Sequence, residues 1–132
     1  MKNWKEKIVQ AGIPFYPVIG NHDHNRDFND DGLSAVTYQE SFGPADYAFC
    51  IGKDMVLVLD NIIYHSRSGY ELGYTAQQLD WIRGLMKFVP KKADIYVAQH
   101  SPLNGRHYAG MIINHDVLLD ILNGHEVTFM SG

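Results

Sequence analysis

The stretch Phe15-Tyr16-Pro17-Val18-Ile19-Gly20-Asn21-His22-Asp23 is where this sequence concentrates its chemistry. The five residues before Gly20 predict a strand, and Pro17 removes one amide donor, which favours a sheet edge or a bulge. An amide oxygen, an imidazole and a carboxylate then occupy three consecutive positions. Polar ligands on loops at strand ends are typical of binding sites in open α/β folds. The stretch therefore predicts a metal or phosphate site where a strand ends.

Helix and strand patterns alternate on both sides of this stretch, which predicts an α/β fold. Thr75 and Gln78 form a capping box at the start of one predicted helix, and Pro90 ends it. Polar, glycine-rich stretches predict loops over 21–33 and 60–73 and a turn at Asn104-Gly105. The predicted helices cover 3–11, 75–89 and 115–122, and the predicted strands cover 15–19, 46–51, 55–59, 95–98 and 127–130.

Composition limits the class of protein. The 132 residues, 45% of them hydrophobic, suffice for one domain or a piece of one. A net charge of -4 without a basic run argues against a nucleic-acid binder. Neither a secretory signal in the first ten residues nor an apolar stretch of membrane-spanning length is visible. The single cysteine, Cys50, excludes an internal disulfide, so the redox compartment stays open. The sequence does not fix an oligomeric state.

His100 follows the predicted strand 95–98, so it is a second candidate ligand at a strand end. Imidazole nitrogen together with amide or carboxylate oxygen suits zinc, iron or manganese. Asp23 beside His22 suggests an imidazole oriented by a carboxylate, as a general acid or a phosphate ligand requires. Structural explanations of these residues stay open at this point. Asn21-His22-Asp23 is then a capped turn, His100 is a structural histidine, and Asp23 caps the turn that follows.

Gly20-Asn21-His22-Asp23 resembles the GNH(D/E) signature of the calcineurin-like metallophosphoesterases. Similarity to that family continues in order along nearly the whole chain. Its helix motif T-x-E-Q-L-x-W-L resembles residues 75–82, and its histidine after a strand resembles His100. The similar segments are Phe42-Gly43-Pro44, Tyr47-Ala48-Phe49, Val58-Leu59-Asp60-Asn61, Thr75-Ala76-Gln77-Gln78-Leu79-Asp80-Trp81-Ile82 and Val97-Ala98-Gln99-His100-Ser101-Pro102-Leu103.

The resemblance implies a layered αββα sandwich, here with incomplete sheets, and a dinuclear centre of manganese, iron or zinc that hydrolyses phosphate mono- or diesters by a metal-activated hydroxide. It implies that Asn21 and His100 ligate one of the metals. It further implies that His22 contacts the scissile phosphate and assists the leaving group. Asp23 would orient His22.

Parts of the family pattern are missing from this sequence. The family begins its site with Asp-x-His and Gly-Asp and finishes with Gly-His-x-His, whereas here only Phe129-Met130-Ser131-Gly132 matches the approach to the last motif. Residues 1–132 are therefore expected to be the central and C-terminal part of a single catalytic domain. Because metal affinity depends on ligand number, we expect this chain alone to hydrolyse phosphoesters poorly or not at all.

An alternative is a non-catalytic binding module with a vestigial site or a calcium loop. Residues 27–32 match the first half of a calcium loop, but Tyr38 occupies the closing acidic position, which favours a solvated acidic loop. His24 is predicted to face solvent. The remaining histidines, His65, His107, His115 and His125, are not expected to touch a metal, and His107 is the best placed of them. Tyr64, Tyr70, Tyr74 and Tyr108 either line a substrate groove or cover the edge of the core.

Overall fold

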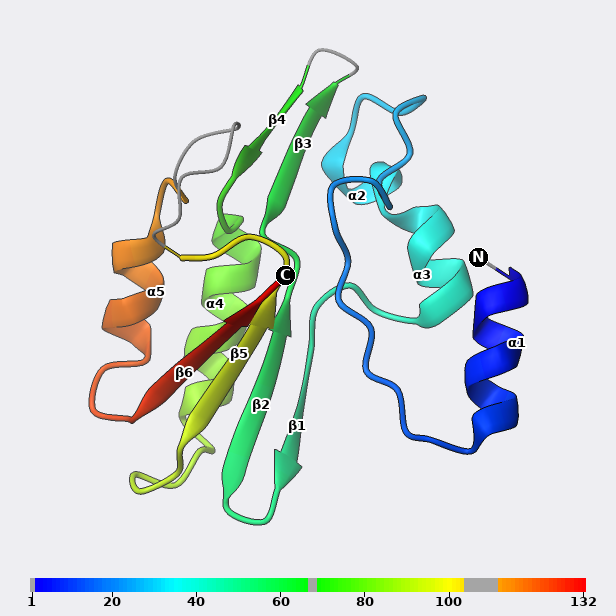
Figure 1. Cartoon of the computed structure of the whole chain (residues 1–132). Helices are drawn as coiled ribbons and strands as arrows, with labels where there is room; N and C mark the ends of the chain where they lie inside the picture. Colours follow the sequence, from blue (N-terminus) through cyan, green and yellow to red (C-terminus); the bar gives the residue numbers. More distant parts are fainter. Residues whose placement is uncertain (1, 67–68, 104–111) are drawn as a thin grey trace.

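A computed structural model of the chain describes residues 2–66, 69–103 and 112–132. Its centre is a four-stranded sheet in the order β1-β2-β5-β6 (Figure 1). The strands are β1 (Tyr47–Ile51), β2 (Asp54–Leu59), β5 (Ile95–Gln99) and β6 (Val127–Ser131). β1 pairs with β2 in the antiparallel sense, whereas β2, β5 and β6 are parallel. The α/β prediction is therefore confirmed.

The three parallel strands end in line with one another. Leu59 of β2 is paired with Gln99 of β5, and Gln99 is paired with Ser131 of β6. The residues that follow these strands consequently emerge at one edge of the sheet, which is where open α/β folds place their sites. At the opposite edge, Gly52 opens the turn between β1 and β2 with a φ of 61°, a conformation that glycine adopts without steric cost.

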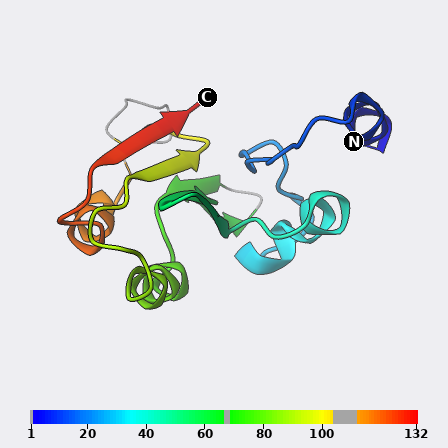
Figure 2. The ribbon, with the colours of Figure 1, turned by 90° about the horizontal axis from the view of Figure 1, so that it is seen from below.

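Two helices cover one face of the sheet: α4 (Ala76–Met86) and α5 (His115–Ile121), as Figure 2 shows. The capping box is confirmed, because Thr75 accepts a hydrogen bond from Gln78 N and the Gln78 side chain accepts one from Thr75 N. Alternate strand residues point toward these helices and are fully buried. Together with buried side chains of the helices they form the main core. Its members include Leu57, Leu59, Ile82, Ile95, Val97, Leu118 and Leu122.

The predicted strand over 15–19 is wrong. This segment runs beside β1 without joining the sheet, since Pro14 and Pro17 lack the amide hydrogens that a ladder needs. Side chains hold it instead: the rings of Tyr16 and Phe49 stack with centroids 4.2 Å apart, and Tyr47 donates a hydrogen bond to Pro17 O at 2.8 Å. The site turn is consequently anchored by side-chain contacts.

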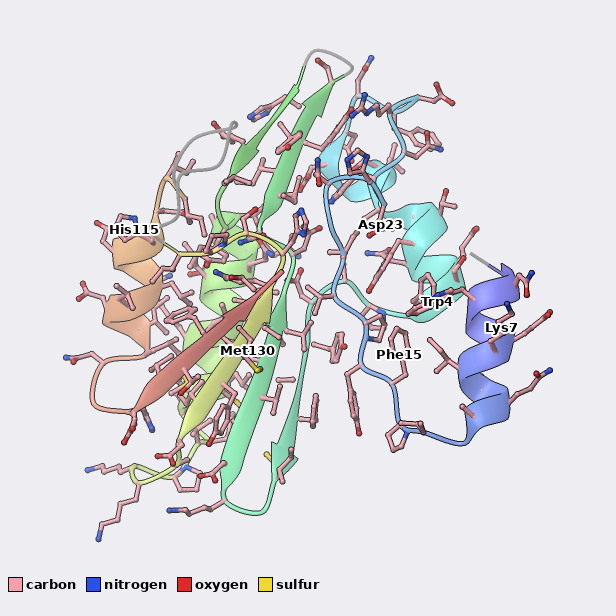
Figure 3. All side chains as sticks on the ribbon, in the orientation of Figure 1. Trp4, Lys7, Phe15, Asp23, His115 and Met130 are labelled. Atoms are coloured by element: carbon pink, nitrogen blue, oxygen red, sulfur yellow. The ribbon has the colours of Figure 1, made fainter. Side chains whose placement is uncertain are left out.

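Helix α1 (Lys2–Ala11) lies on the far side of this segment from the sheet, and its Trp4 meets Phe15 edge to face at 5.5 Å (Figure 3). The loop predicted over 21–33 leads into two short helices, α2 (Asp31–Ser34) and α3 (Val36–Phe42). A small second cluster of buried residues joins Ile19 to Tyr38 of α3. Within the described residues, no helix is long and apolar enough to cross a bilayer.

The loop predicted over 60–73 is wrong as well. It contains an antiparallel pair, β3 (Ile62–Ser66) and β4 (Gly69–Leu72), that rises above the carboxyl ends of the parallel strands (Figure 1). Ile62 and Leu72 face the main core, and this burial stabilises the pair against the local turn signals. The pair places Tyr70 near the site turn.

Candidate metal centre

The carboxyl ends of β5 and β6 and the Gly20–Asp23 turn enclose a pocket of about 450 Å³. Asn21 and His100 line it together with His22 and Asp23. All four predicted site residues thus meet in one place, although Asn21 and His100 are 79 positions apart in the sequence.

The ring of His100 is held with its Nε2 toward the pocket. His100 Nδ1 lies 3.0 Å from the main-chain oxygen of Gly132, so Nδ1 carries the hydrogen and donates it. Nε2 then carries the lone pair, which is the tautomer that ligates metals. A Cβ on Gly20 would lie 3.2 Å from His100 Nδ1 and 3.3 Å from two ring carbons, so the absence of a side chain at Gly20 lets the ring sit here.

The Asn21 side chain faces His100 from the other wall of the pocket. It is 4% exposed, and its Oδ1 lies 3.0 Å from His100 Nε2. Asn21 Nδ2 donates to the hydroxyl of Tyr70 on β4 at 3.1 Å. Tyr70 therefore turns the amide so that its oxygen, rather than its nitrogen, points at His100.

This donor pair fits a divalent cation. A hydrogen on Nε2 makes this contact a hydrogen bond to Asn21 Oδ1, and in the tautomer without that hydrogen both atoms are acceptors. Their separation of 3.0 Å is about that of neighbouring ligands on an ion whose bonds are about 2.1 Å long. In the described part of the chain, no group of three or more His, Cys, Asp and Glu side chains converges as a metal cluster would. The pair thus offers one nitrogen and one oxygen ligand.

His22 and Asp23 take different places in the same turn. His22 is exposed on the pocket wall, where a bound ligand could reach it. Asp23 Oδ2 accepts a hydrogen bond from Gly20 N at 2.9 Å, and Asp23 N donates to Gly20 O at the same distance. The Asp23 carboxylate closes the turn through these contacts. That position shapes the turn, whereas an orienting contact with His22 stays a prediction.

A buried polar clamp fixes the chain directly after His100. Asn61 Nδ2 donates to Ser101 O at 2.8 Å, and Ser101 N donates to Asn61 Oδ1 at 3.2 Å. Gln99 Nε2 also donates to Ser101 O, while Tyr74 donates to Gln99 Oε1 at 2.6 Å. Asn61 is fully buried, so the clamp holds His100 relative to β2. From the sequence, Asp60-Asn61 at the end of a strand is explained equally well as support for the site or as a simple turn, and the structure places Asn61 in the clamp.

The model of one protein family, calcineurin-like phosphoesterase, matches residues 1–132. The chain belongs to the calcineurin-like phosphoesterase family. The recognition made from the motifs is thereby confirmed, and the membership indicates metal-dependent hydrolysis of phosphoesters. No curated protein matches the sequence. The four-stranded sheet with helices on one face is consistent with part of the family's sandwich.

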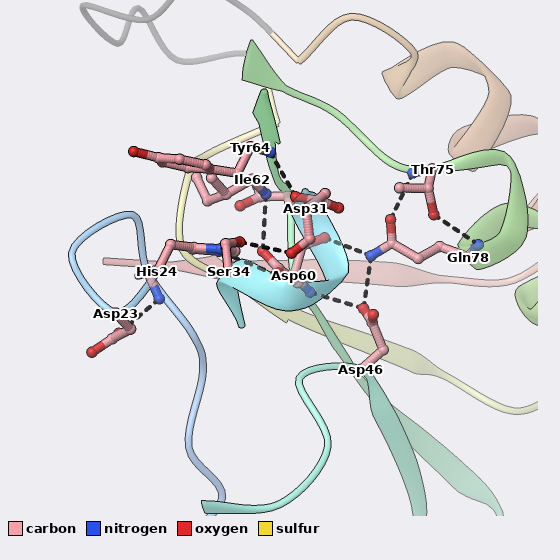
Figure 4. A network of polar contacts seen from close by, with 12 residues as sticks. Asp23, His24, Asp31, Ser34, Asp46, Asp60, Ile62, Tyr64, Thr75 and Gln78 are labelled. Atoms are coloured by element: carbon pink, nitrogen blue, oxygen red, sulfur yellow. Dashed lines mark hydrogen bonds and ion pairs between the residues drawn. The ribbon is translucent and has the colours of Figure 1, made fainter. Parts of the chain in front are cut away.

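A polar network joins the start of α4 to the chain at the end of β2 (Figure 4). Gln78 Nε2 donates to Asp46 Oδ1 at 2.8 Å and to Asp60 O at 2.6 Å, and Asp60 N donates to Asp46 Oδ1 at 2.9 Å. Burial raises the pKa of Asp46 to about 6, with the hydrogen bonds from Gln78 and Asp60 opposing that rise. The capping residue of α4 thus also ties the helix to the end of β2.

The prediction that His24 faces solvent is wrong. Its side chain is 0% exposed and lies between Ser34 and Asp60, both far from it in sequence. Ser34 Oγ and Asp60 Oδ2 supply polar contacts that the local sequence around His24 does not reveal. This burial next to the site turn is unusual for histidine, which is on average only partly buried.

The acidic loop of the calcium-loop alternative uses its carboxylates elsewhere. Asp30 Oδ1 accepts from Leu33 N as the N-cap of α2, and Asp31 Oδ1 accepts from Tyr64 N at 2.6 Å. Tyr38, at the closing position, is 2% exposed in the second core cluster. These contacts favour structural roles over a calcium loop.

The other histidines make structural contacts. His65 pairs with Glu71 at 3.1 Å, His115 with Ile112 O and His125 with Ala93 O. Tyr64 and Tyr74 are buried, and Tyr70 reaches Asn21. His107, Tyr108 and the turn predicted at Asn104-Gly105 lie outside the described residues.

Gly20→Ala is expected to weaken metal binding at least about tenfold, because the new Cβ would push the His100 ring away from its oxygen partner at Gly132. Mn²⁺ titration, followed by the paramagnetic broadening of His100 signals, measures this. Gly84→Ala in α4, whose Cβ would meet nothing within 4 Å, is the matched control and should leave the titration unchanged. Equal Mn²⁺ affinity in both variants would contradict the close-approach argument.

Proposed function

We propose that this chain carries part of a metallophosphoesterase site for phosphate mono- or diesters. In this proposal Asn21 and His100 ligate one ion of a dinuclear centre, and His22 contacts the substrate. The observation that carries the proposal is the convergence of Asn21 Oδ1 and His100 Nε2, 3.0 Å apart, in a pocket at the ends of parallel strands. Tyr70 and Gly132 support it because they orient these two donor atoms.

Each residue has a distinct task in the proposed reaction. Bound divalent ions, of manganese, iron or zinc, would supply Lewis-acid polarisation of the phosphoryl oxygens and activate the attacking water. The exposed imidazole of His22 would contact the scissile phosphate and protonate the leaving oxygen. Asp23 holds the backbone of the turn and, in this proposal, orients His22. Rigid support of the turn keeps these groups in register with the phosphate.

We further propose that the other ligands of the centre come from sequence outside residues 1–132, so that this chain is the central and C-terminal part of a catalytic domain. Among the described residues the proposed ligand count is small, which supports this view, because Asn21 and His100 provide one amide oxygen and one imidazole nitrogen. Two ligands hold a divalent ion weakly. The isolated chain should therefore have little or no activity.

The test is to strip the chain of metal and then add Mn²⁺, Fe²⁺ or Zn²⁺. Hydrolysis of p-nitrophenyl phosphate and bis(p-nitrophenyl) phosphate reports monoesterase and diesterase activity. We expect rates near those of the metal ions alone, with weak Mn²⁺ binding that broadens the signals of His100. Turnover by the isolated chain would contradict the ligand count, and an absence of broadening at His100 would contradict the metal site.

A further inference from the structure

His24 lies one residue after the Gly20–Asp23 turn and connects that turn to the main sheet. Its Nδ1 lies 2.6 Å from Ser34 Oγ at the end of α2, and its Nε2 lies 3.4 Å from Asp60 Oδ2 directly after β2 (Figure 4). The imidazole also stacks on the ring of Tyr64 in β3, with centroids 5.8 Å apart and planes 7° apart. Three elements thus enclose one fully buried side chain.

Both ring nitrogens of His24 face polar partners. Ser34 Oγ lies 2.6 Å from Nδ1 and 2.7 Å from Asp31 O, so this hydroxyl links the ring to α2. Nε2 is buried and faces the Asp60 carboxylate at 3.4 Å. The facing carboxylate favours the tautomer that carries its hydrogen on Nε2.

Two carboxyl groups lie close to this ring. Asp60 faces His24 from the end of β2, Asp31 from α2, and the Tyr64 ring from β3. Burial raises the pKa of Asp31, and the nearby charge of Asp60 raises it further. The His24 ring thus lies between polar groups of separate elements in a buried region.

The turn needs such an anchor because the segment before it is outside the sheet. Two backbone hydrogen bonds of the turn and the residues after it are local: Asp23 N donates to Gly20 O, and Asn25 N donates to Ser34 O at 2.8 Å. Asp60, by contrast, is fixed to the sheet, since its N–H donates to Asp46 and its Oδ1 accepts from Ile62 N at 3.0 Å. A contact with Asp60 therefore transfers the position of β2 to the turn.

We infer that His24 is a positioning residue whose buried imidazole ties the Gly20–Asp23 turn to Asp60 and so keeps Asn21 against His100. Its value for catalysis rests on the proposed function of Asn21 and His100. The tether itself is a property of the metal-free chain. It follows from the geometry of Ser34, Asp60 and Tyr64 around one ring.

The first measurement is a ¹⁵N spectrum of the histidine rings in the metal-free chain. We expect Nε2 of His24, which faces Asp60, to carry a hydrogen that exchanges slowly with solvent. Exchange of the Asn25 amide hydrogen is the second readout. In His24→Asn, whose amide can replace only Nδ1, we expect this exchange to accelerate about tenfold or more and the Asn21 signals to shift. His24→Gln, whose amide can replace Nε2, should restore part of the protection.

His65→Asn is the matched control, because His65 is an exposed histidine on β3. In this variant the exchange rate of the Asn25 amide hydrogen should equal that of the unsubstituted chain. A His24 ring without a hydrogen on Nε2 would overturn the inference without any variant. Unchanged Asn25 exchange and Asn21 signals in His24→Asn would overturn it as well. Failure of Mn²⁺ to broaden His100 counts against the proposed function alone, since the ring nitrogens and the Asn25 amide report the tether without metal.

Discussion

His100→Ala is expected to lower Mn²⁺ affinity by at least about 100-fold, which for a weak site means loss of measurable binding. The change removes the imidazole that faces Asn21 Oδ1 at 3.0 Å and leaves, of the two proposed ligands, only the amide oxygen of Asn21. A single neutral amide oxygen cannot compete with water for a divalent ion. Paramagnetic broadening of the Asn21 side-chain amide during Mn²⁺ titration measures the loss.

His115→Ala is the matched control for this experiment. His115 stands at the start of α5, where its Nδ1 contacts Ile112 O at 2.9 Å, and it does not line the pocket. We expect Mn²⁺ affinity in this variant to equal that of the unsubstituted chain. Because His100 is only partly buried, its replacement should leave the fold intact, and the amide spectrum of the core strands checks this. Undiminished broadening at Asn21 in His100→Ala would show that the ion binds elsewhere.

Elements with strong local signals could be predicted from the sequence. Thr75 and Gln78 define the start of α4 by themselves, and the run Met55–Leu59 is apolar enough to indicate a buried strand. The β3–β4 pair gives no such signal. Its stability comes from Ile62 and Leu72 packing on core residues that are distant in sequence, so turn-forming residues dominated the local pattern.

The candidate site likewise has parts that the sequence predicts and parts that it does not. The motif and the strand ends indicated Asn21 and His100, and the structure brings their side chains together. Their role as ligands stays a prediction. The contacts that hold them were not predicted, because Tyr70, Asn61 and His24 act through partners far along the chain. Sequence periodicity reports burial on regular elements, whereas Asn61 and His24 lie in loops and Tyr70 lies in a strand of only four residues.

Asp46→Asn is expected to stabilise the chain increasingly as the pH rises from about 4 to about 7. Burial raises the pKa of Asp46 from 3.8 in the unfolded chain to about 6 in the folded one. The folded state therefore binds this proton more tightly. The resulting stabilisation is complete below pH 3.8 and is lost as the pH rises through about 6. Asparagine avoids the loss because it stays neutral.

The size of the effect follows from the separation of the two pKa values, about two pH units, which corresponds to roughly 2–3 kcal/mol at most. Asparagine keeps an oxygen that can accept from Gln78 Nε2 and Asp60 N, so the network should survive the change. Urea unfolding of both proteins from pH 4 to pH 7 measures the difference in unfolding free energy, in which the shared titration of Asp31 cancels.

Asp80→Asn on the exposed side of α4 is the control, because the Asp80 side chain is 76% exposed and pairs with Arg83 on the surface. Its stability difference should stay within about 0.5 kcal/mol over the same pH range. A stability difference for Asp46→Asn that stays constant with pH would mean that Asp46 ionises as in the unfolded chain. If instead the asparagine variant lost stability relative to the unsubstituted chain as the pH rose, the donors at Asp46 Oδ1 would outweigh burial. The carboxylate would then be a stabilising charge at the junction of α4 and β2.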